Sequence, residues 1–345
     1  MVYDVFDVMV INLTSAPILF FVLGVLAVAV KSDLFIPSDV GRVVVTFLMA
    51  SIGIRAGADI VEMPGGLLAV VPYALTALIF GVTVAAISYF LLVKLLRLDS
   101  ANAGALAGSF GAVSSATLMV AISLMDSLGI TYEKFVPALY PFMDSPAIIM
   151  AVFLGKWGME RQKSLQVSSD SPAKALKGNG KEKKLSSMIV ESMTNSGVYV
   201  LLGSLVIGLI TGPERLEREM RFFDGMFRGI LCIFLLDMGI LAASRLKELK
   251  AVSPLVVPLA ITIAFVNGIV SVYVATALGL SPGGALVFSA LAAGASYVTV
   301  PAAMRVSLPE ANPSLYLGTA IGIVFPFNMA IGLPVYLMFA QYLAR

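Results

Sequence analysis

Ten long apolar runs, separated by short polar segments, constrain the fold of this chain more than any other feature of the sequence. A helix needs about 20 apolar residues to cross a bilayer. The runs lie near residues 16–30, 40–56, 67–93, 103–125, 135–155, 191–211, 225–243, 251–278, 284–303 and 314–343. Only 13% of the residues are charged, about half the fraction that is usual in soluble domains. We therefore predict an all-α polytopic membrane protein with about ten transmembrane helices.

One long polar segment separates the first five runs from the last five. It extends from about Lys156 to Ser187 and contains eight Lys or Arg residues but only three acidic ones. Loops rich in Lys and Arg remain in the cytoplasm. We predict a first transmembrane repeat at 1–157, a cytoplasmic linker at 158–188 and a second transmembrane repeat at 189–345.

Five spans on each side of a cytoplasmic linker place both termini outside. With this orientation, 16 Lys and Arg residues fall inside and 7 fall outside, as the positive-inside rule requires. The first four residues, 1–4, lack a basic region, so we expect no cleaved signal peptide and a retained first helix.

The two halves of the sequence resemble each other. Residues 47–56 (FLMASIGIRA) align with 233–242 (IFLLDMGILA), and Pro141-Phe142 aligns with Pro326-Phe327 at nearly the same offset. Because each half has an odd number of spans, the halves must cross the membrane in opposite directions. We predict a five-plus-five inverted repeat, the architecture in which substrate binds near the midplane between helices broken at corresponding positions.

Two segments rich in small and hydroxyl residues, 108–117 and 293–301, are the predicted helix breaks. Pro301 in the second segment is expected to interrupt a regular helix. A half-helix that starts inside the membrane presents unpaired N–H groups and a positive dipole end, which bind a small anion. Close packing of small residues is the alternative interpretation. The substrate-binding candidates are Gly111, Ala112, Val113, Ser114, Ser296 and Thr299.

Asp144 is a carboxylate inside an apolar span, flanked by Pro141 and Pro146. A bare carboxylate there costs several kcal/mol unless a cation or a proton offsets it. We predict a Na⁺ site near Asp144, and a structural helix cap is the alternative. The further ion-binding candidates are Ser115, Thr117 and Tyr297.

Two other polar residues lie in the apolar spans of the second half. Asn328, the counterpart of Asp144, is neutral and suits a weaker structural role. Asp237 lies in the middle of its span, and it is interpreted equally well as a coupling-ion ligand or as a partner in an interhelical hydrogen bond or salt bridge.

Several functional classes are disfavoured by what the sequence lacks. It has no His, the usual general base, and no nucleotide-binding loop, so we expect neither an enzyme nor an organic cofactor. Its single cysteine, Cys232, excludes an intrachain disulfide. The net charge of +2 gives no reason to expect a nucleic-acid partner. Transport driven by an ion gradient is the favoured function, and a channel or membrane sensor is less favoured.

At these residues the sequence resembles the SbtA-type sodium-dependent bicarbonate transporters of cyanobacteria. The matching stretches are residues 110–114 (FGAVS), 138–144 (ALYPFMD), 227–229 (FRG) and 311–314 (ANPS). The resemblance implies Na⁺-coupled bicarbonate uptake across a bacterial inner membrane by an elevator-type movement in a homotrimer. It also implies regulation by a cytoplasmic PII-like protein.

Carried over by position, the first broken helix of that family maps to 111–114 and its acidic residue to Asp144. The second broken helix differs, because the cyanobacterial members have Asp, Ser and Gly where this chain has Tyr297, Thr299 and Val300. The missing carboxylate removes a sodium ligand. A transporter of the same fold for another small monoanion, coupled to protons, is therefore the alternative to a Na⁺/bicarbonate symporter.

The charge distribution predicts the accessibility of single cysteines introduced into a Cys232→Ala background. A cysteine near Lys177 should be protected from impermeant thiol reagents in intact cells, whereas cysteines near Met1 and Arg345 should both react. Opposite accessibility of the two termini would mean an odd number of spans and would contradict the five-plus-five repeat.

Overall fold

The computed structural model describes residues 4–167, 196–219, 221–248 and 254–345, and these residues form helices and loops without a strand. The helices of the first half are α1 (Val5–Leu13), α2 (Ala16–Ala29), α3 (Ser38–Glu62), α4 (Leu67–Leu95), α5 (Ser100–Gly111), α6 (Ser115–Leu128), the 3₁₀-helix η1 (Val136–Leu139) and α7 (Tyr140–Val167).

The second half also contains long helices and an interrupted one. Its elements are α9 (Ser196–Thr211), α10 (Pro213–Glu219), α11 (Arg221–Glu248), α12 (Val256–Ala277), α13 (Pro282–Ala292), α14 (Thr299–Ser307), α15 (Pro313–Thr319), η3 (Ala320–Val324), α16 (Phe325–Phe327), η4 (Asn328–Gly332) and α17 (Leu333–Leu343). The elements η3 and η4 are π-helical turns on either side of Pro326, where the missing N–H favours a widened turn.

Seven helical stretches in the described residues are long and apolar enough to cross a membrane, or eight if the bent pair α1–α2 counts as one span. The helices α9 and α13 are apolar but shorter. The prediction of an all-helical, multi-pass membrane protein is confirmed. The predicted number of ten spans stays a prediction, because α9 and α13 are too short to qualify by length.

Three predicted boundaries differ from the structure. A further helix, α1, precedes the predicted first span and meets α2 at a bend of 59°. The helix α7 continues to Val167, past the predicted start of the linker at 158, and residues 168–195 of the linker lie outside the described residues. Pro301 lies in the first turn of α14, where a missing N–H is tolerated; it marks the start of a helix and interrupts none.

Two helix pairs pack at close range along their lengths: α2 on α11, and α3 on α9. Glycines permit this approach. A methyl group at Gly24 or Gly239 would overlap a backbone carbonyl of the facing helix, and the same holds for Gly57 and Gly208 at the other crossing. Small residues at such crossings are usual in membranes, where dispersion contacts drive helix association.

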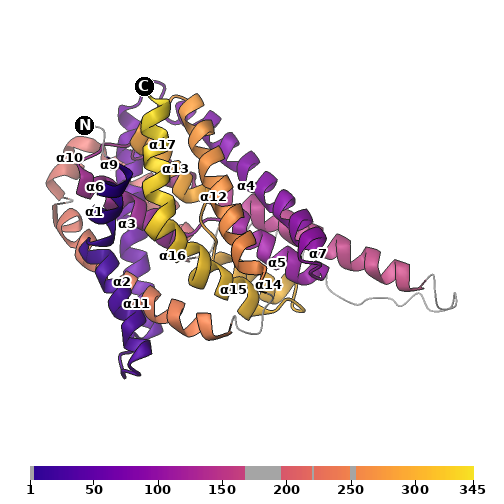
Figure 1. Ribbon diagram of the computed structural model, residues 1–345. Helices are drawn as coiled ribbons and strands as arrows, with labels where there is room; N and C mark the ends of the chain where they lie inside the picture. The colour runs from indigo at the N-terminus through magenta and orange to yellow at the C-terminus, as the bar shows by residue number, and fades with distance from the viewer. Residues whose placement is uncertain (1–3, 168–195, 220, 249–253) are drawn as a thin grey trace.

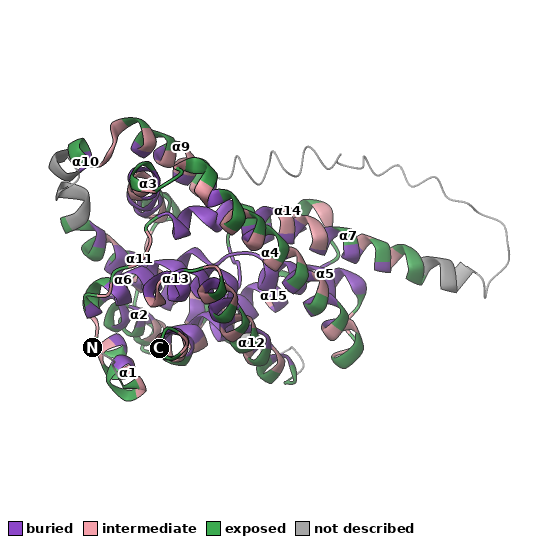
Figure 2. Cartoon of the chain, turned by 90° about the horizontal axis from the view of Figure 1, so that it is seen from above, coloured by how far each residue is buried: buried purple, intermediate pink, exposed green. Residues whose placement is uncertain are grey.

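The remaining long helices form two groups of three. Helices α4, α5 and α7 contact one another, as do α12, α13 and α17. Figure 2 shows buried residues concentrated where these groups meet around α13 and exposed residues on the outward faces of α4 and α12. Large apolar side chains such as Ile79 and Val266 are exposed on those faces, as expected of helices in contact with lipid. Figure 1 shows the two termini at the same end of the molecule.

The close crossing of α3 and α9 predicts a position-dependent cost of enlarging glycine. Gly208→Val should lower the free energy of unfolding by about 2 kcal/mol or more, since overpacking moves the facing backbone. Gly203→Val is the matched control on the same helix, because a Cβ atom there has no neighbour within 4 Å. Thermal unfolding of the two purified variants checks this, and equal midpoints would contradict the packing.

Candidate functional site

Two interrupted spans form the centre of the site. The chain leaves α5 at Gly111 and starts α6 at Ser115, and it leaves α13 at Ala292 and starts α14 at Thr299. Ser114 is the N-cap of α6, and its hydroxyl oxygen accepts a hydrogen bond from the backbone N–H of Thr117 at 3.3 Å. The predicted discontinuities are therefore present at both positions, each within an apolar environment.

The two interruptions are bonded to each other. The hydroxyl of Ser109 donates to the carbonyl oxygen of Ser296 at 2.6 Å, and the N–H of Ser296 donates back to the carbonyl oxygen of Ser109 at 2.8 Å. A Cβ atom at Gly294 would lie 2.7 Å from Cβ of Ser114, so only glycine permits this contact. The two breaks thus satisfy part of each other's polar groups.

Asp144 on α7 joins the two interruptions from the side. Its Oδ1 accepts a hydrogen bond from the N–H of Val113 at 2.9 Å and one from the hydroxyl of Thr299 at 3.1 Å. Because the single proton of Thr299 is used there, Ser296 must donate in the 2.7 Å contact between the hydroxyls of Ser296 and Thr299. Four of the predicted site residues, from α7, the first interruption and the second interruption with the start of α14, are therefore brought together.

The second oxygen of Asp144 has no partner. Asp144 is fully buried, at 0% exposed, and Oδ2 makes no hydrogen bond within the described residues. An unpaired buried charge is costly, and buried charges are ordinarily paired or bound to a metal. The arrangement therefore suits a cation at Oδ2 and fits the Na⁺ that the sequence predicts.

The ligands of such a cation would be mostly neutral oxygens. No group of three or more His, Cys, Asp or Glu residues that could hold a metal ion occurs in the described part of the chain. One carboxylate with hydroxyl and carbonyl oxygens suits a monovalent cation at a broken helix.

The other predicted ion-binding residues form a separate cluster at the start of α6. The hydroxyl of Tyr297 lies 3.4 Å from Oγ of Ser115, the first residue of α6. The hydroxyl of Thr117 donates to Oγ of Ser114 at 3.0 Å. Within the described residues, none of Ser115, Thr117 and Tyr297 is hydrogen-bonded to Asp144, so the predicted ion-binding set is divided between two places.

Two residues that the sequence analysis did not single out contribute to the site. Ser109 joins the breaks, as described above, and the hydroxyl of Tyr140 donates to the carbonyl oxygen of Val113 at 3.4 Å. Both lie in segments that the analysis had marked, Ser109 in 108–117 and Tyr140 in the run that ends at Asp144. Their roles depend on contacts with other segments, which the sequence does not display.

The remaining polar candidates have different surroundings. Asn328 is buried, and its amide donates to the carbonyl oxygen of Ala293 at 2.7 Å while its Oδ1 lies 3.2 Å from the hydroxyl of Tyr336. This is a structural role at the second break. Asp237 is half-buried on α11 and forms no hydrogen bond or salt bridge with any other residue that the structure describes.

The comparison with known families gives a match over nearly the whole chain. The profile of the Na⁺-dependent bicarbonate transporter superfamily covers residues 16–341, a range that includes both interrupted spans and Asp144. The chain belongs to this superfamily. A search of curated proteins finds no match.

Membership accounts for the main features of the site in this transporter. A sodium-dependent family requires a place for a cation, and the unpaired oxygen of Asp144 offers one. An anion substrate and a lipid environment agree with the broken helices and the exposed apolar faces. The resemblance drawn from residues 110–114 and 138–144 is thereby confirmed at the level of the family.

Proposed function

We propose that this transporter is a Na⁺-coupled bicarbonate symporter that works by an elevator-type movement. The observation that carries the proposal is the buried carboxylate of Asp144, which has one oxygen without a partner between two interrupted spans. Na⁺ at Oδ2 offsets the cost of the buried charge and adds a positive charge beside the anion site. Ion and anion then bind with positive cooperativity, which linkage makes reciprocal.

The start of α6 is the proposed anion site. The N–H of Val113 is used by Asp144, but the N–H groups of Ser114 and Ser115 donate no hydrogen bond within the described residues. They point out of a helix start whose dipole favours an anion. Gly111 lets the first break pack against Ala85 and Ala147, and the hydroxyls of Ser296 and Thr299 hold Asp144 from the second break.

The five-plus-five inverted repeat is supported by the exchanged helix pairing. The first span of the first half (α2) packs on the second span of the second half (α11). The first span of the second half (α9) packs in the same way on the second span of the first half (α3). A two-fold relation between the halves requires such matching pairs. These four helices form the proposed scaffold. The two groups of three that carry the interrupted spans form the proposed moving part.

The surroundings of the transporter follow from the same proposal. It is placed in the inner membrane of a bacterium as a homotrimer, with both termini outside and the linker in the cytoplasm, where a PII-like protein binds. The position of both termini at one end of the molecule (Figure 1) supports an even number of crossings.

Replacing the central carboxylate tests the coupling. Asp144→Asn should fold but lose the dependence of bicarbonate binding on Na⁺, because the amide no longer attracts a cation. Asp144→Glu should also be impaired, since an added methylene displaces the oxygens. Asp39→Asn is the matched control, because Asp39 is 85% exposed in a surface ion pair with Arg42. Bicarbonate affinity is titrated against Na⁺ at several fixed pH values. Affinity that follows pH and ignores Na⁺ would overturn sodium coupling and favour proton coupling.

Changes at the start of α6 test the anion site. Gly111→Leu should abolish uptake of labelled bicarbonate into vesicles, since a Cβ atom there would lie 2.8 Å from Cβ of Ala85 and 3.0 Å from Cβ of Ala147. Ser114→Ala should weaken apparent affinity by about 0.5–1.5 kcal/mol, the value of one neutral hydrogen bond. Gly203→Leu on the exposed face of α9 is the control for added volume. Unchanged uptake in both site variants would place the anion elsewhere.

A further inference from the structure

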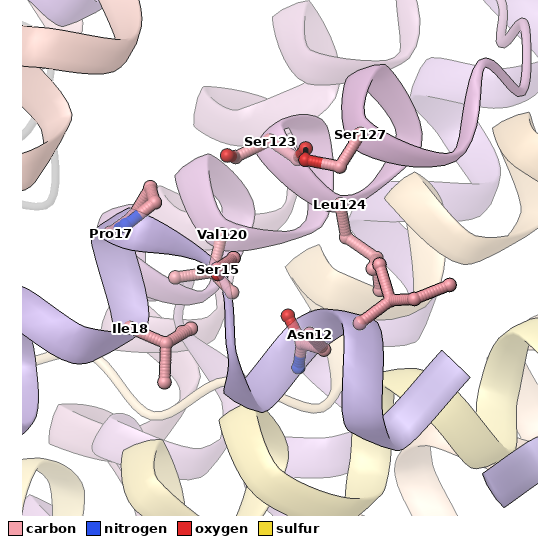
Figure 3. Close-up of a pocket in the computed structure, with 9 residues that line it drawn as sticks. Asn12, Ser15, Pro17, Ile18, Val120, Ser123, Leu124 and Ser127 are labelled. Carbon is pink, nitrogen blue, oxygen red and sulfur yellow. Dashed lines mark hydrogen bonds between the residues drawn. The ribbon is translucent and has the colours of Figure 1, made fainter. Parts of the chain in front are cut away.

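A second cavity lies at the bend between α1 and α2, away from Asp144. It has a volume of about 350 Å³ and is lined by residues of α1, α2, α6 and α11: Ile11, Ser15, Ala16, Pro17, Ser123, Ser127, Arg228, Gly229 and Cys232. A small enclosed extension reaches Asn12, Ile18, Val120 and Leu124. Figure 3 shows Ser123 and Ser127 on α6 on one side and Asn12, Ser15 and Pro17 at the bend on the other. The space holds a small ion together with several waters, each of which occupies about 30 Å³.

The charged side chain among the described lining residues is basic and exposed. Arg228 is the charged residue among those that line it, and no acidic residue occurs among the described lining residues. Arg228 forms no salt bridge within the part of the chain that the structure describes. The helix α2 starts at the cavity, and the side chain of its N-cap residue, Ser15, makes no capping hydrogen bond, so N–H groups of its first turn are free to meet an anion.

One serine side chain in the lining, that of Ser123, has no hydrogen-bond partner among the described residues. Ser123 is only 5% exposed, and its side chain makes no hydrogen bond within the described residues, although its carbonyl oxygen accepts one from the hydroxyl of Ser127 at 2.8 Å. Buried polar side chains are normally satisfied by protein, water or ligand. The cavity is also open at its α11 wall, because a Cβ atom at Gly229 would have no neighbour within 4 Å.

We infer that this cavity is a second binding site, for a small monovalent oxyanion. Arg228 attracts the anion, the hydroxyl of Ser123 donates a hydrogen bond to it, and the start of α2 stabilises its charge. Ser123 lies eight residues beyond Ser115 on α6, a rise of about 12 Å, so one helix connects the cavity to the proposed central site. With the orientation that the charge distribution predicts, the cavity faces outside, on the side from which the anion is taken up.

The chain carries its own reporter for this site. Cys232 lines the cavity and is the only cysteine in the sequence. It lies four residues after Arg228 on α11 and hence on the same face. The rate at which an anionic methanethiosulfonate reagent modifies Cys232 in the purified full-length chain, in detergent without added lipid, measures occupancy. The inference rests on the proposed function only for the choice of bicarbonate as one probe, and nitrate is the other.

Bicarbonate or nitrate should slow the modification of Cys232, while gluconate at equal ionic strength should not. Arg228→Gln should weaken this protection about tenfold or more in apparent affinity, as the loss of a charged hydrogen bond does. Ser123→Ala should weaken it about three- to tenfold. Arg215→Gln, a change of the same charge at an exposed position on α10, should behave as the unaltered chain. Equal protection in Arg228→Gln, or equal slowing by gluconate, would overturn the inference.

The Asp144→Asn variant separates this site from the central one. Protection of Cys232 by bicarbonate or nitrate should persist in that variant even though sodium-coupled binding is lost. If Asp144→Asn abolishes the protection, the anion that protects Cys232 binds at the central site, and the inference of a second site is overturned. If the unaltered chain fails to transport bicarbonate but nitrate still protects Cys232, the proposed substrate is wrong and the second site stands.

Discussion

The structure depends on how polar groups are satisfied where two helices are interrupted inside an apolar protein. An interrupted helix in a membrane leaves N–H and carbonyl groups that cannot turn to water. Here the breaks satisfy each other through the paired hydrogen bonds between Ser109 and Ser296, and Asp144 takes the N–H of Val113. One oxygen of the central carboxylate, Oδ2 of Asp144, remains without a partner, and the proposed coupling cation would offset that cost.

Close glycine packing and polar interruptions divide the molecule by function. The crossings at Gly24 with Gly239 and at Gly57 with Gly208 bring backbones together without polar side chains, which suits a rigid scaffold. The helices around α13 carry the hydrogen-bonded breaks. Contacts such as that between the carboxylate of Asp59 on α3 and the N–H of Phe135, at 3.0 Å, connect the two parts. In the proposed mechanism, the part that carries the site moves against the part built on the glycine crossings.

Tyr297 illustrates how one substitution changes the chemistry of such a site. The resemblance places an acidic residue at this position, whereas here a neutral phenol lies against Ser115 and Ala116 at the start of α6. A hydroxyl can donate to an anion or accept from the helix N–H groups, but it does not repel a negative substrate. The change leaves Asp144 as the one carboxylate among the predicted site residues.

Hydropathy and small-residue runs determined the all-helical membrane fold, the two interruptions and the importance of Asp144, since each depends on residues close together in the sequence. The same local signals missed the bend between α1 and α2 and misjudged Pro301, which begins a helix. The tertiary structure alone decided that Ser109 faces Ser296 and that Tyr140 reaches Val113. It also decided that the hydroxyl of Tyr297 contacts Ser115, while the Asp144 carboxylate bonds to Val113 and Thr299. Those outcomes depend on which helices cross and at which residues. The residues at which two helices cross depend on how closely their backbones can approach, and the helices are far apart in the sequence. Hydropathy along the chain carries no information about such contacts.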